Sequence, residues 1–248
     1  MVTDNDLQRQ ASTGDDTEDY RRVFRKQVFQ LLKWGYDRLN ASEYQAAEEE
    51  DITGEFAKEI NFMLEDRTLP KWVSHFYVHE EYRVNVKGRK GKRRKRLDIV
   101  FIRTQYGVRP HFPFEAKRLS AGTHPIGKYL GVEGLGQFLT GDYGQEVSEG
   151  GMLGYVQSHT SDYWAQKAIE KIINAPQEYQ IFKKGCWINE EILEGLSACY
   201  RSTHHRLLGK SPIAIFHCFL IFLGVPHNKS VLKAFHDNDL KIGTQYRI

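Results

Sequence analysis

Three charged residues on two neighbouring segments of the sequence have the types and spacing needed to hydrolyse a phosphate ester. Asp98 lies in RRKRLDIVFIRT (93–104), and sixteen residues separate it from Glu115 and Lys117 in HFPFEAKRL (111–119). Two carboxylates held at one point repel each other unless a divalent cation lies between them. A lysine beside them could orient or deprotonate a water, or stabilise charge that develops on a phosphate. The pattern therefore predicts metal-assisted hydrolysis of a phosphodiester.

The two segments have the composition of strands, and the alternation of side chains along a strand decides which residues can meet. Three successive strands are expected over 72–86, 95–104 and 111–119. Glu115 and Lys117 then point to one face of the sheet, whereas Ala116 points to the other face, against a helix. A hairpin-like connection of this length brings Asp98 beside Glu115.

The rest of the chain predicts helices and strands that enclose this sheet. Helices are expected over 20–39, 42–66, 127–144 and 161–176, and further strands over 150–158 and 213–223. The order of one helix, three meandering strands, a helix and a strand predicts an α/β fold with one mixed sheet flanked by helices. We expect a single domain over residues 20–248, preceded by a polar, disordered tail at 1–19.

Composition argues against several other classes of protein. The chain has 248 residues, 40% hydrophobic and 27% charged, and its net charge of +3 does not by itself indicate a nucleic-acid partner. The N-terminus lacks the apolar segment of a secretory signal, and the longest apolar stretch, 212–225, is too short to span a bilayer. Cys186, Cys199 and Cys218 are too widely spaced for a disulfide framework or a zinc knuckle. We therefore expect a cytoplasmic protein with no membrane partner.

The segment that starts at Asp98 and ends in Glu115-Ala116-Lys117 resembles the PD-(D/E)xK nuclease signature, although Leu97 stands where a proline is usual. The surrounding order of elements is similar to that superfamily over roughly residues 42–170. The resemblance implies a restriction-endonuclease-like fold with an αβββαβ core. It also implies a Mg²⁺ or Mn²⁺ ion held by the two acids and the Ala116 carbonyl, with Lys117 serving the attacking water. The implied substrate is nucleic acid, DNA in preference to RNA.

Members of this superfamily often add a glutamate from the first helix and, in one branch, a glutamine from the crossover helix. Glu49 lies seven residues before Phe56, close to the apolar stripe of the expected helix, where an acid needs a partner. Glu49 is therefore the expected ligand from this helix, with Glu55 as the second choice. Gln137 stands at the place of the glutamine, although the tyrosine expected four residues later is Tyr143, six residues later.

A basic run precedes Asp98: eight of the ten residues from 87 to 96 are lysine or arginine. Such a run is often only a solvated loop or an address signal. Beside the expected site it predicts contacts with phosphates, which position a nucleic acid without reading its sequence. The candidates for these contacts are Lys87, Arg89, Lys90, Lys92, Arg93, Arg94, Lys95 and, after the motif, Arg118.

Several of these residues also have purely structural interpretations. Asp98 could be an acid at a strand end that pairs with Arg96 or Arg118. Aromatic residues of the first strand could stack on bases, but aromatic residues in a strand more often belong to the core; these are Trp72, Tyr77 and Tyr82.

Three histidines are better explained by structure than by catalysis. Adjacent residues on a strand face opposite ways, so at most one of His204 and His205 can point at a site, and one of them is expected at the surface. His217, within the last apolar strand, is expected to be buried and hydrogen-bonded.

Three functional interpretations remain open from the sequence. The first is a metal-dependent endonuclease in restriction, phage defence or mobile-element biology. Cleavage of both strands would need two active sites, so a homodimer or a partner subunit is plausible. The second is a non-catalytic nucleic-acid-binding module on the same fold. The third is a structural subunit of a larger defence assembly.

Overall fold

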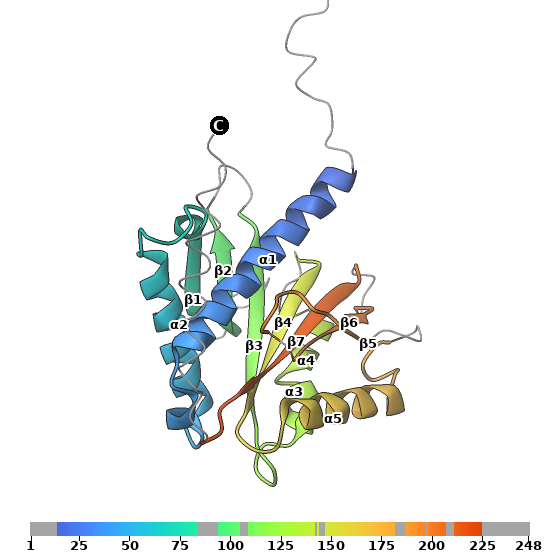
Figure 1. The fold of residues 1–248 in the computed structure, drawn as a ribbon. Helices are drawn as coiled ribbons and strands as arrows, with labels where there is room; N and C mark the ends of the chain where they lie inside the picture. The colour runs from blue at the N-terminus through green and yellow to red at the C-terminus, as the bar shows by residue number, and fades with distance from the viewer. Residues whose placement is uncertain are drawn as a thin grey trace, which may run out of the picture.

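The structure of the chain, a computed structural model, is one seven-stranded sheet with helices on both faces (Figure 1). It describes residues 14–83, 94–104, 109–141, 143, 147–181, 187–196, 198–206 and 211–224, with side chains from Glu18 onward. In spatial order the strands are β1 (Phe76–Arg83), β2 (Arg96–Arg103), β3 (His111–Leu119), β4 (Glu149–Val156), β7 (Ile213–Ile221), β6 (Cys199–His204) and β5 (Trp187–Asn189). The helices are α1 (Gly14–Arg38), α2 (Glu49–Leu64), α3 (Ile126–Leu130), α4 (Leu135–Leu139) and α5 (Ser161–Asn174).

Strand direction divides the sheet into three parts. β1, β2 and β3 form an antiparallel meander, as the sequence predicts. β3, β4 and β7 run parallel, and β6 and β5 continue antiparallel beyond β7. Parallel neighbours need a crossover connection, and α3 and α4 lie in the connection from β3 to β4. The expected α/β fold with a mixed sheet flanked by helices is therefore confirmed.

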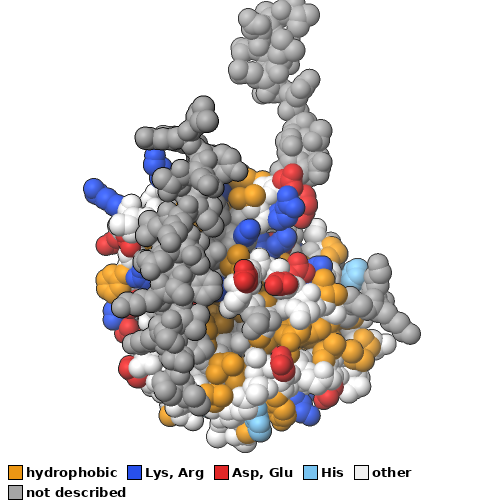
Figure 2. Space-filling view, in the orientation of Figure 1, with side chains coloured by type: hydrophobic (Ala, Val, Ile, Leu, Met, Phe, Trp, Pro, Cys, Tyr) orange, Lys and Arg blue, Asp and Glu red, His pale blue; other side chains and the backbone are white. Residues whose placement is uncertain are grey.

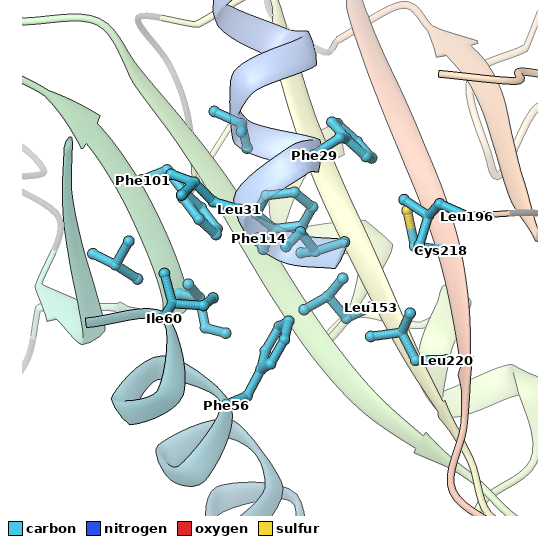
Figure 3. Packing of buried hydrophobic residues seen from close by; sticks show 14 of the residues in the cluster. Phe29, Leu31, Phe56, Ile60, Phe101, Phe114, Leu153, Leu196, Cys218 and Leu220 are labelled. Atoms are coloured by element: carbon cyan, nitrogen blue, oxygen red, sulfur yellow. The ribbon is translucent and has the colours of Figure 1, made fainter. Parts of the chain in front are cut away.

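Two layers of helices cover the sheet, and burial assigns each strand residue to one of them. α1 and α2 pack on one face, where their side chains meet Phe101, Phe114 and Leu153 (Figure 3). α3, α4 and α5 pack on the other face, against a second group that includes Val100 and Met152. Burial of apolar surface on both faces holds the layers together.

The first helices differ from the sequence-based boundaries. α1 begins at Gly14, so residues 14–19 are helical rather than disordered, and the rest of the expected tail lies outside the described residues. The helix expected over 42–66 is shorter, because a 3₁₀ turn occupies Ala41–Tyr44 and α2 begins only at Glu49. Glu49 therefore lies at the start of the helix rather than within its apolar stripe.

The helix expected over 127–144 is divided into α3 and α4 by closely packed glycines. A Cβ at Gly134 would lie 2.1 Å from the carbonyl oxygen of Tyr129. A Cβ at Gly131 would lie 2.6 Å from the carbonyl oxygen of Gly127. The glycines thus allow a tight turn between two short helices, which a longer side chain would prevent.

The described surface carries a mixture of side-chain types, and two of the three cysteines lie within the described residues. The face seen in Figure 2 mixes acidic, basic and hydrophobic side chains, in keeping with a net charge of only +3. None of the helices in the described ranges is long and apolar enough to cross a membrane. Cys199 and Cys218 are buried free thiols on neighbouring strands, and Cys186 lies outside the described residues.

Buried polar side chains on β6 and β7 form a hydrogen-bonded chain. Ser202 Oγ lies 2.6 Å from His204 Nε2 and 2.7 Å from His217 Nε2, and His204 Nδ1 lies 2.7 Å from the Tyr179 carbonyl oxygen. Only a ring N–H can bond to that carbonyl, so Ser202 donates to His204 and accepts from His217. The prediction of a buried, hydrogen-bonded His217 is confirmed, and of the adjacent pair His204 is buried and His205 exposed.

Gly151 on β4 lets the ring of Phe114 lie against the strand, which predicts a specific packing defect. A Cβ at Gly151 would lie 2.1 Å from two ring carbons of Phe114 in the core. Gly151→Ala is expected to lower the free energy of unfolding in urea by roughly 2 kcal/mol, because overpacking costs about 1–3 kcal/mol. Gly127→Ala is the matched control, since its Cβ would meet only Lys171 Cε at 4.0 Å. Equal stability of the two variants would show that Phe114 moves aside at no cost.

The buried state of His204 predicts a pH dependence. Burial lowers the pKa of His204 from 6.5 to about 4, against the opposing effect of its bond to the Tyr179 carbonyl. Because the folded pKa lies below the unfolded pKa, the stability from this histidine is complete above pH 6.5 and is lost as the pH falls toward 4. An NMR titration of the ring protons should find His204 uncharged at a pH midway between 4 and 6.5. The urea-unfolded chain is the control, in which the same ring should be charged. A folded-state pKa near 6.5 would contradict this assignment.

Candidate active site

The first two strands lose their regular alternation at Asp98 and at the residue opposite it, Glu81. These two residues are missing from the paired register of β1 and β2, and Glu81 has φ = +48°, in the left-handed region. Ile99 packs under α1 and α2, whereas Leu97, two residues away, packs on the opposite face. Asp98 therefore lies at the point where the side-chain alternation of β2 shifts by one residue. Its carboxylate points along the sheet toward β3.

Two carboxylates accept hydrogen bonds from backbone amides on the edge of β3 that faces β2. Backbone pairing of β2 with β3 stops two residues before Ala116. The Ala116 amide donates to Asp98 Oδ2 at 2.6 Å, and the Arg118 amide donates to Glu49 Oε2 at 3.1 Å. Alternate amides of a strand point to the same edge, so the side chains of Asp98 and Glu49 replace the missing strand as acceptors.

Glu49 reaches β3 because hydrogen bonds hold the chain before α2 against the sheet. Gln157, just after β4, donates from Nε2 to the carbonyls of Ala47 at 2.8 Å and Tyr44 at 3.0 Å. The Arg118 guanidinium also donates to the Ala47 carbonyl, at 3.3 Å. Glu49 is the first residue of α2, where the helix dipole favours a negative charge.

Lys117 occupies the centre of these acids. Its Nζ atom lies 2.8 Å from Glu49 Oε1, 3.0 Å from Glu115 Oε1 and 3.9 Å from Asp98 Oδ2. It also donates to the Ala116 carbonyl at 2.6 Å. All the groups expected as metal ligands therefore surround one cationic atom. We call this set the acid cluster: Glu49, Asp98, Glu115, the Ala116 carbonyl and Lys117.

Burial disfavours the charged forms of the residues in the acid cluster, which shifts their pKa values. Burial raises the pKa of Asp98 to about 6, although Lys117 and the Ala116 amide act to lower it. Burial and the nearby Asp98 raise the pKa of Glu115 well above its usual range. Burial alone would lower the pKa of Lys117, but the three surrounding carboxylates raise it above its ordinary value. One ammonium thus compensates the three acids only in part.

The oxygen atoms of the acid cluster are of the chemical kind that binds a divalent cation. Glu115 is buried, and its Oε2 atom has no hydrogen-bond partner among the described residues, which is costly for a carboxylate. Carboxylate and carbonyl oxygens are the donors that Mg²⁺ and Mn²⁺ prefer. As the side chains stand, no three His, Cys, Asp or Glu residues within the described ranges are spaced to hold a metal ion. Binding of such an ion would require Lys117 to move aside and the carboxylates to draw closer together.

Two other residues singled out in the sequence lie apart from the acid cluster. Glu55 pairs with Lys58 on the exposed side of α2, so Glu49 is the helix acid that joins the cluster. Gln137 is buried in α4, where Nε2 donates to the Val132 carbonyl at 2.5 Å and Oε1 has no partner within the described part of the chain. No contact among the described residues joins Gln137 to the acid cluster.

The structural interpretation of Asp98 required a pair with Arg96 or Arg118, but the contacts of the described residues join both arginines to other acids. Arg96 Nη1 lies 2.5 Å from Glu81 Oε1, and Arg118 pairs with Glu48. Of the candidates for phosphate contact, Arg94 and Lys95 precede β2 and Arg118 lies on β3. The others lie outside the described residues: Lys87, Arg89, Lys90, Lys92 and Arg93.

Several residues that position the acid cluster belong to no recognisable sequence motif. Gln157 holds the chain before α2, as described above, and Thr53 Oγ1 lies 3.0 Å from Tyr155 Oη inside the core, which ties α2 to β4. Tyr143 Oη donates to the Arg96 carbonyl at the start of β2. The only sequence signal was polarity at apolar positions: Thr53 in the stripe of α2, and Gln157 directly after an apolar strand.

Comparisons with known proteins identify no relative of this chain. No protein-family model, no curated protein and no solved structure matches the chain.

Removal of Lys117 should leave three carboxylates without a compensating charge. In EDTA, Lys117→Met is expected to lower the free energy of unfolding by roughly 3 kcal/mol, because breaking a buried ion pair leaves uncompensated charge. Lys58→Met is the matched control, since Lys58 also pairs with a glutamate but at the exposed surface, where the loss should be small. Urea unfolding measures both variants. Equal losses would show that the acid cluster does not depend on Lys117.

Proposed function

We propose that the chain is a divalent-metal-dependent nuclease of the PD-(D/E)xK kind, on a restriction-endonuclease-like fold. The observation that carries the proposal is the convergence of three acids and the Ala116 carbonyl on the Lys117 ammonium. The acids come from α2, β2 and β3, and the elements from α2 to β4 follow the αβββαβ order with two short helices, α3 and α4, in place of the single crossover helix. A cluster of titratable groups with shifted pKa values is typical of a functional site.

The residues of the acid cluster have distinct roles in this proposal. Mg²⁺ or Mn²⁺, held by Glu49, Asp98, Glu115 and the Ala116 carbonyl, supplies charge stabilisation to the phosphate and lowers the pKa of a water. The amides of Ala116 and Arg118 orient the carboxylates of Asp98 and Glu49. Burial strengthens each charge interaction by keeping bulk water away.

Lys117 takes two positions in this proposal. Two cations cannot share one point, so Lys117 Nζ withdraws from the centre when a divalent ion is held. Its flexible four-carbon side chain allows this movement, and its ammonium then orients the attacking water or stabilises charge on the phosphate. Without the ion, the same ammonium compensates the acids and stabilises the fold.

The proposed substrate is nucleic acid, DNA in preference to RNA, in restriction, phage defence or mobile-element biology in the cytoplasm. Arg94, Lys95 and Arg118 lie near the ends of the two strands that carry the acids, where they can contact phosphates. One acid cluster cuts one strand at a time, so cleavage of a duplex calls for a homodimer or a partner within a larger defence complex.

Cleavage of supercoiled plasmid and of a linear single strand should require both a divalent ion and the acid cluster. The wild type is expected to cut with Mg²⁺ or Mn²⁺ and to stop cutting in EDTA. Asp98→Ala and Lys117→Ala should lower the rate about 100-fold or more, because they remove charge that stabilises the transition state. Gel assays of product formation measure these rates, with circular dichroism to confirm that each variant is folded.

Glu55→Ala is the matched control for Glu49→Ala, because both remove an acid from α2 and only Glu49 belongs to the acid cluster. The control should cut at the wild-type rate and Glu49→Ala should not. Cleavage that survives in Asp98→Ala, or that is lost equally in both helix variants, would refute the proposed site.

One feature of the site favours a second interpretation, a non-catalytic nucleic-acid-binding or structural subunit on the same fold. Lys117 already provides a cation for the acids, so the fold can form without a metal ion. Titration calorimetry with Mn²⁺ separates the two interpretations. One bound ion that is lost in Glu115→Gln supports the nuclease, whereas nucleic-acid binding with neither ion binding nor cleavage supports the subunit.

A further inference from the structure

A row of aromatic rings lies on the exposed face of β1, outside the acid cluster. The rings of Tyr77 and His79 are stacked, with centroids 5.6 Å apart and planes 19° apart, and the Tyr82 ring follows at 6.0 Å from His79. Tyr77 is 58% exposed and His79 is also exposed, whereas Trp72 packs against the core. We call Tyr77, His79 and Tyr82 the aromatic row. A contiguous row of exposed rings, unlike a single exposed residue, can form a binding surface.

The unusual backbone of Glu81 builds the aromatic row. Regular alternation would place Glu81 rather than Tyr82 on the same face as His79. The φ of +48° at Glu81 shifts the alternation by one residue. Tyr82 therefore packs toward the α3–α5 side of the sheet, and its ring meets that of His79. Strained backbone of this kind is maintained where the surrounding structure demands it, often at functional sites.

The aromatic row lies on the same face of the sheet as Glu115 and Lys117 of the acid cluster, because Phe114 and Ala116, which alternate with them, pack on the opposite face. His79 pairs with Val100 on β2, and Val100 pairs with Pro113 on β3. Asp98 and Glu115 lie two residues further along these strands, which is about 7 Å at the rise of a strand. β1 is the outermost strand of the described sheet (Figure 1). The register places Tyr82 opposite Leu97, next to Asp98, and Tyr77 opposite Ile102, so the row runs away from the acid cluster along this margin.

Basic residues flank the end of the aromatic row that is nearest the acid cluster. β1 ends at Arg83, and the register pairs Arg83 with Arg96 at the start of β2. Arg94 and Lys95 directly precede β2. Although Arg96 pairs with Glu81, the surface beside the acids thus combines exposed rings with basic side chains, which match the bases and the phosphates of a nucleic acid.

We propose that the aromatic row binds unpaired bases of a single-stranded nucleic acid and leads its backbone to the acid cluster. The inference rests on the proposed nuclease function and specifies the strandedness of its substrate. Open ring faces stack on any base, but only where the base is not already paired and stacked within a duplex. The row therefore selects single strands without reading their sequence.

Fluorescence anisotropy with a labelled oligothymidylate of about 15 nucleotides tests the proposal. In EDTA, where no cleavage occurs, Tyr77→Ala should weaken single-strand binding about tenfold and leave binding of a duplex of equal length unchanged. Tyr77→Phe, which keeps the ring, should bind the single strand as the wild type does. Phe62→Ala is the matched control, because Phe62 is a similarly exposed ring, at 54%, on α2 at the opposite face.

The outcomes separate this inference from the nuclease proposal. Weaker single-strand binding by Tyr77→Ala supports the aromatic row even if no substrate is ever cut. If the double variant of Tyr77→Ala and His79→Ala binds the single strand with wild-type affinity, the role of the aromatic row is refuted, even if the protein cuts DNA. A wild type that binds no single strand would refute it as well. Equal weakening of duplex binding, or a change from dimer to monomer in sedimentation, would also overturn it, because the rings would then contact a duplex or a second copy.

Discussion

The compensation of three carboxylates by a single cation is the interaction on which this site depends. Glu49, Asp98 and Glu115 come from three separate elements, and each would be unfavourable in its place without a positive charge. Lys117 provides that charge at hydrogen-bonding distance from two of them. Its position therefore links the start of α2 to the point where β2 and β3 separate. A divalent ion in the same place would make the same links with more charge.

A local irregularity of the sheet makes this arrangement possible. Regular pairing would have used the amide of Ala116 in the backbone ladder, but the break opposite Glu81 leaves that amide for the Asp98 carboxylate. The same break brings Tyr82 into line with His79 on the outer strand. One departure from alternation thus serves both the acid cluster and the aromatic row. Irregular strands near functional residues often have this use, because they direct side chains that a regular strand would point elsewhere.

The sequence predicted the antiparallel meander and the members of the acid cluster, for reasons that are local. The spacing of Glu115 and Lys117 decides that they share a face, and the strand pattern around Asp98 decides that it can reach them. The sequence predicts Glu49 from its place near an apolar stripe, whereas the structure places it at the first residue of α2. Glu49 joins the cluster for a different reason, because Gln157 holds the carbonyls of Tyr44 and Ala47, just before the helix, against the sheet.

What the sequence by itself determined is the pattern of residues: which strands are apolar, which side chains alternate, and which acids could share a cation. What only the tertiary structure decided is which polar groups find one another. The division of the expected helix at Gly131 and Gly134, the satisfaction of β3 amides by carboxylates, and the exposure of Tyr77 all depend on contacts between distant segments. Periodicity reports the environment of each residue along one element, but hydrogen bonds and burial arise only when the elements pack together.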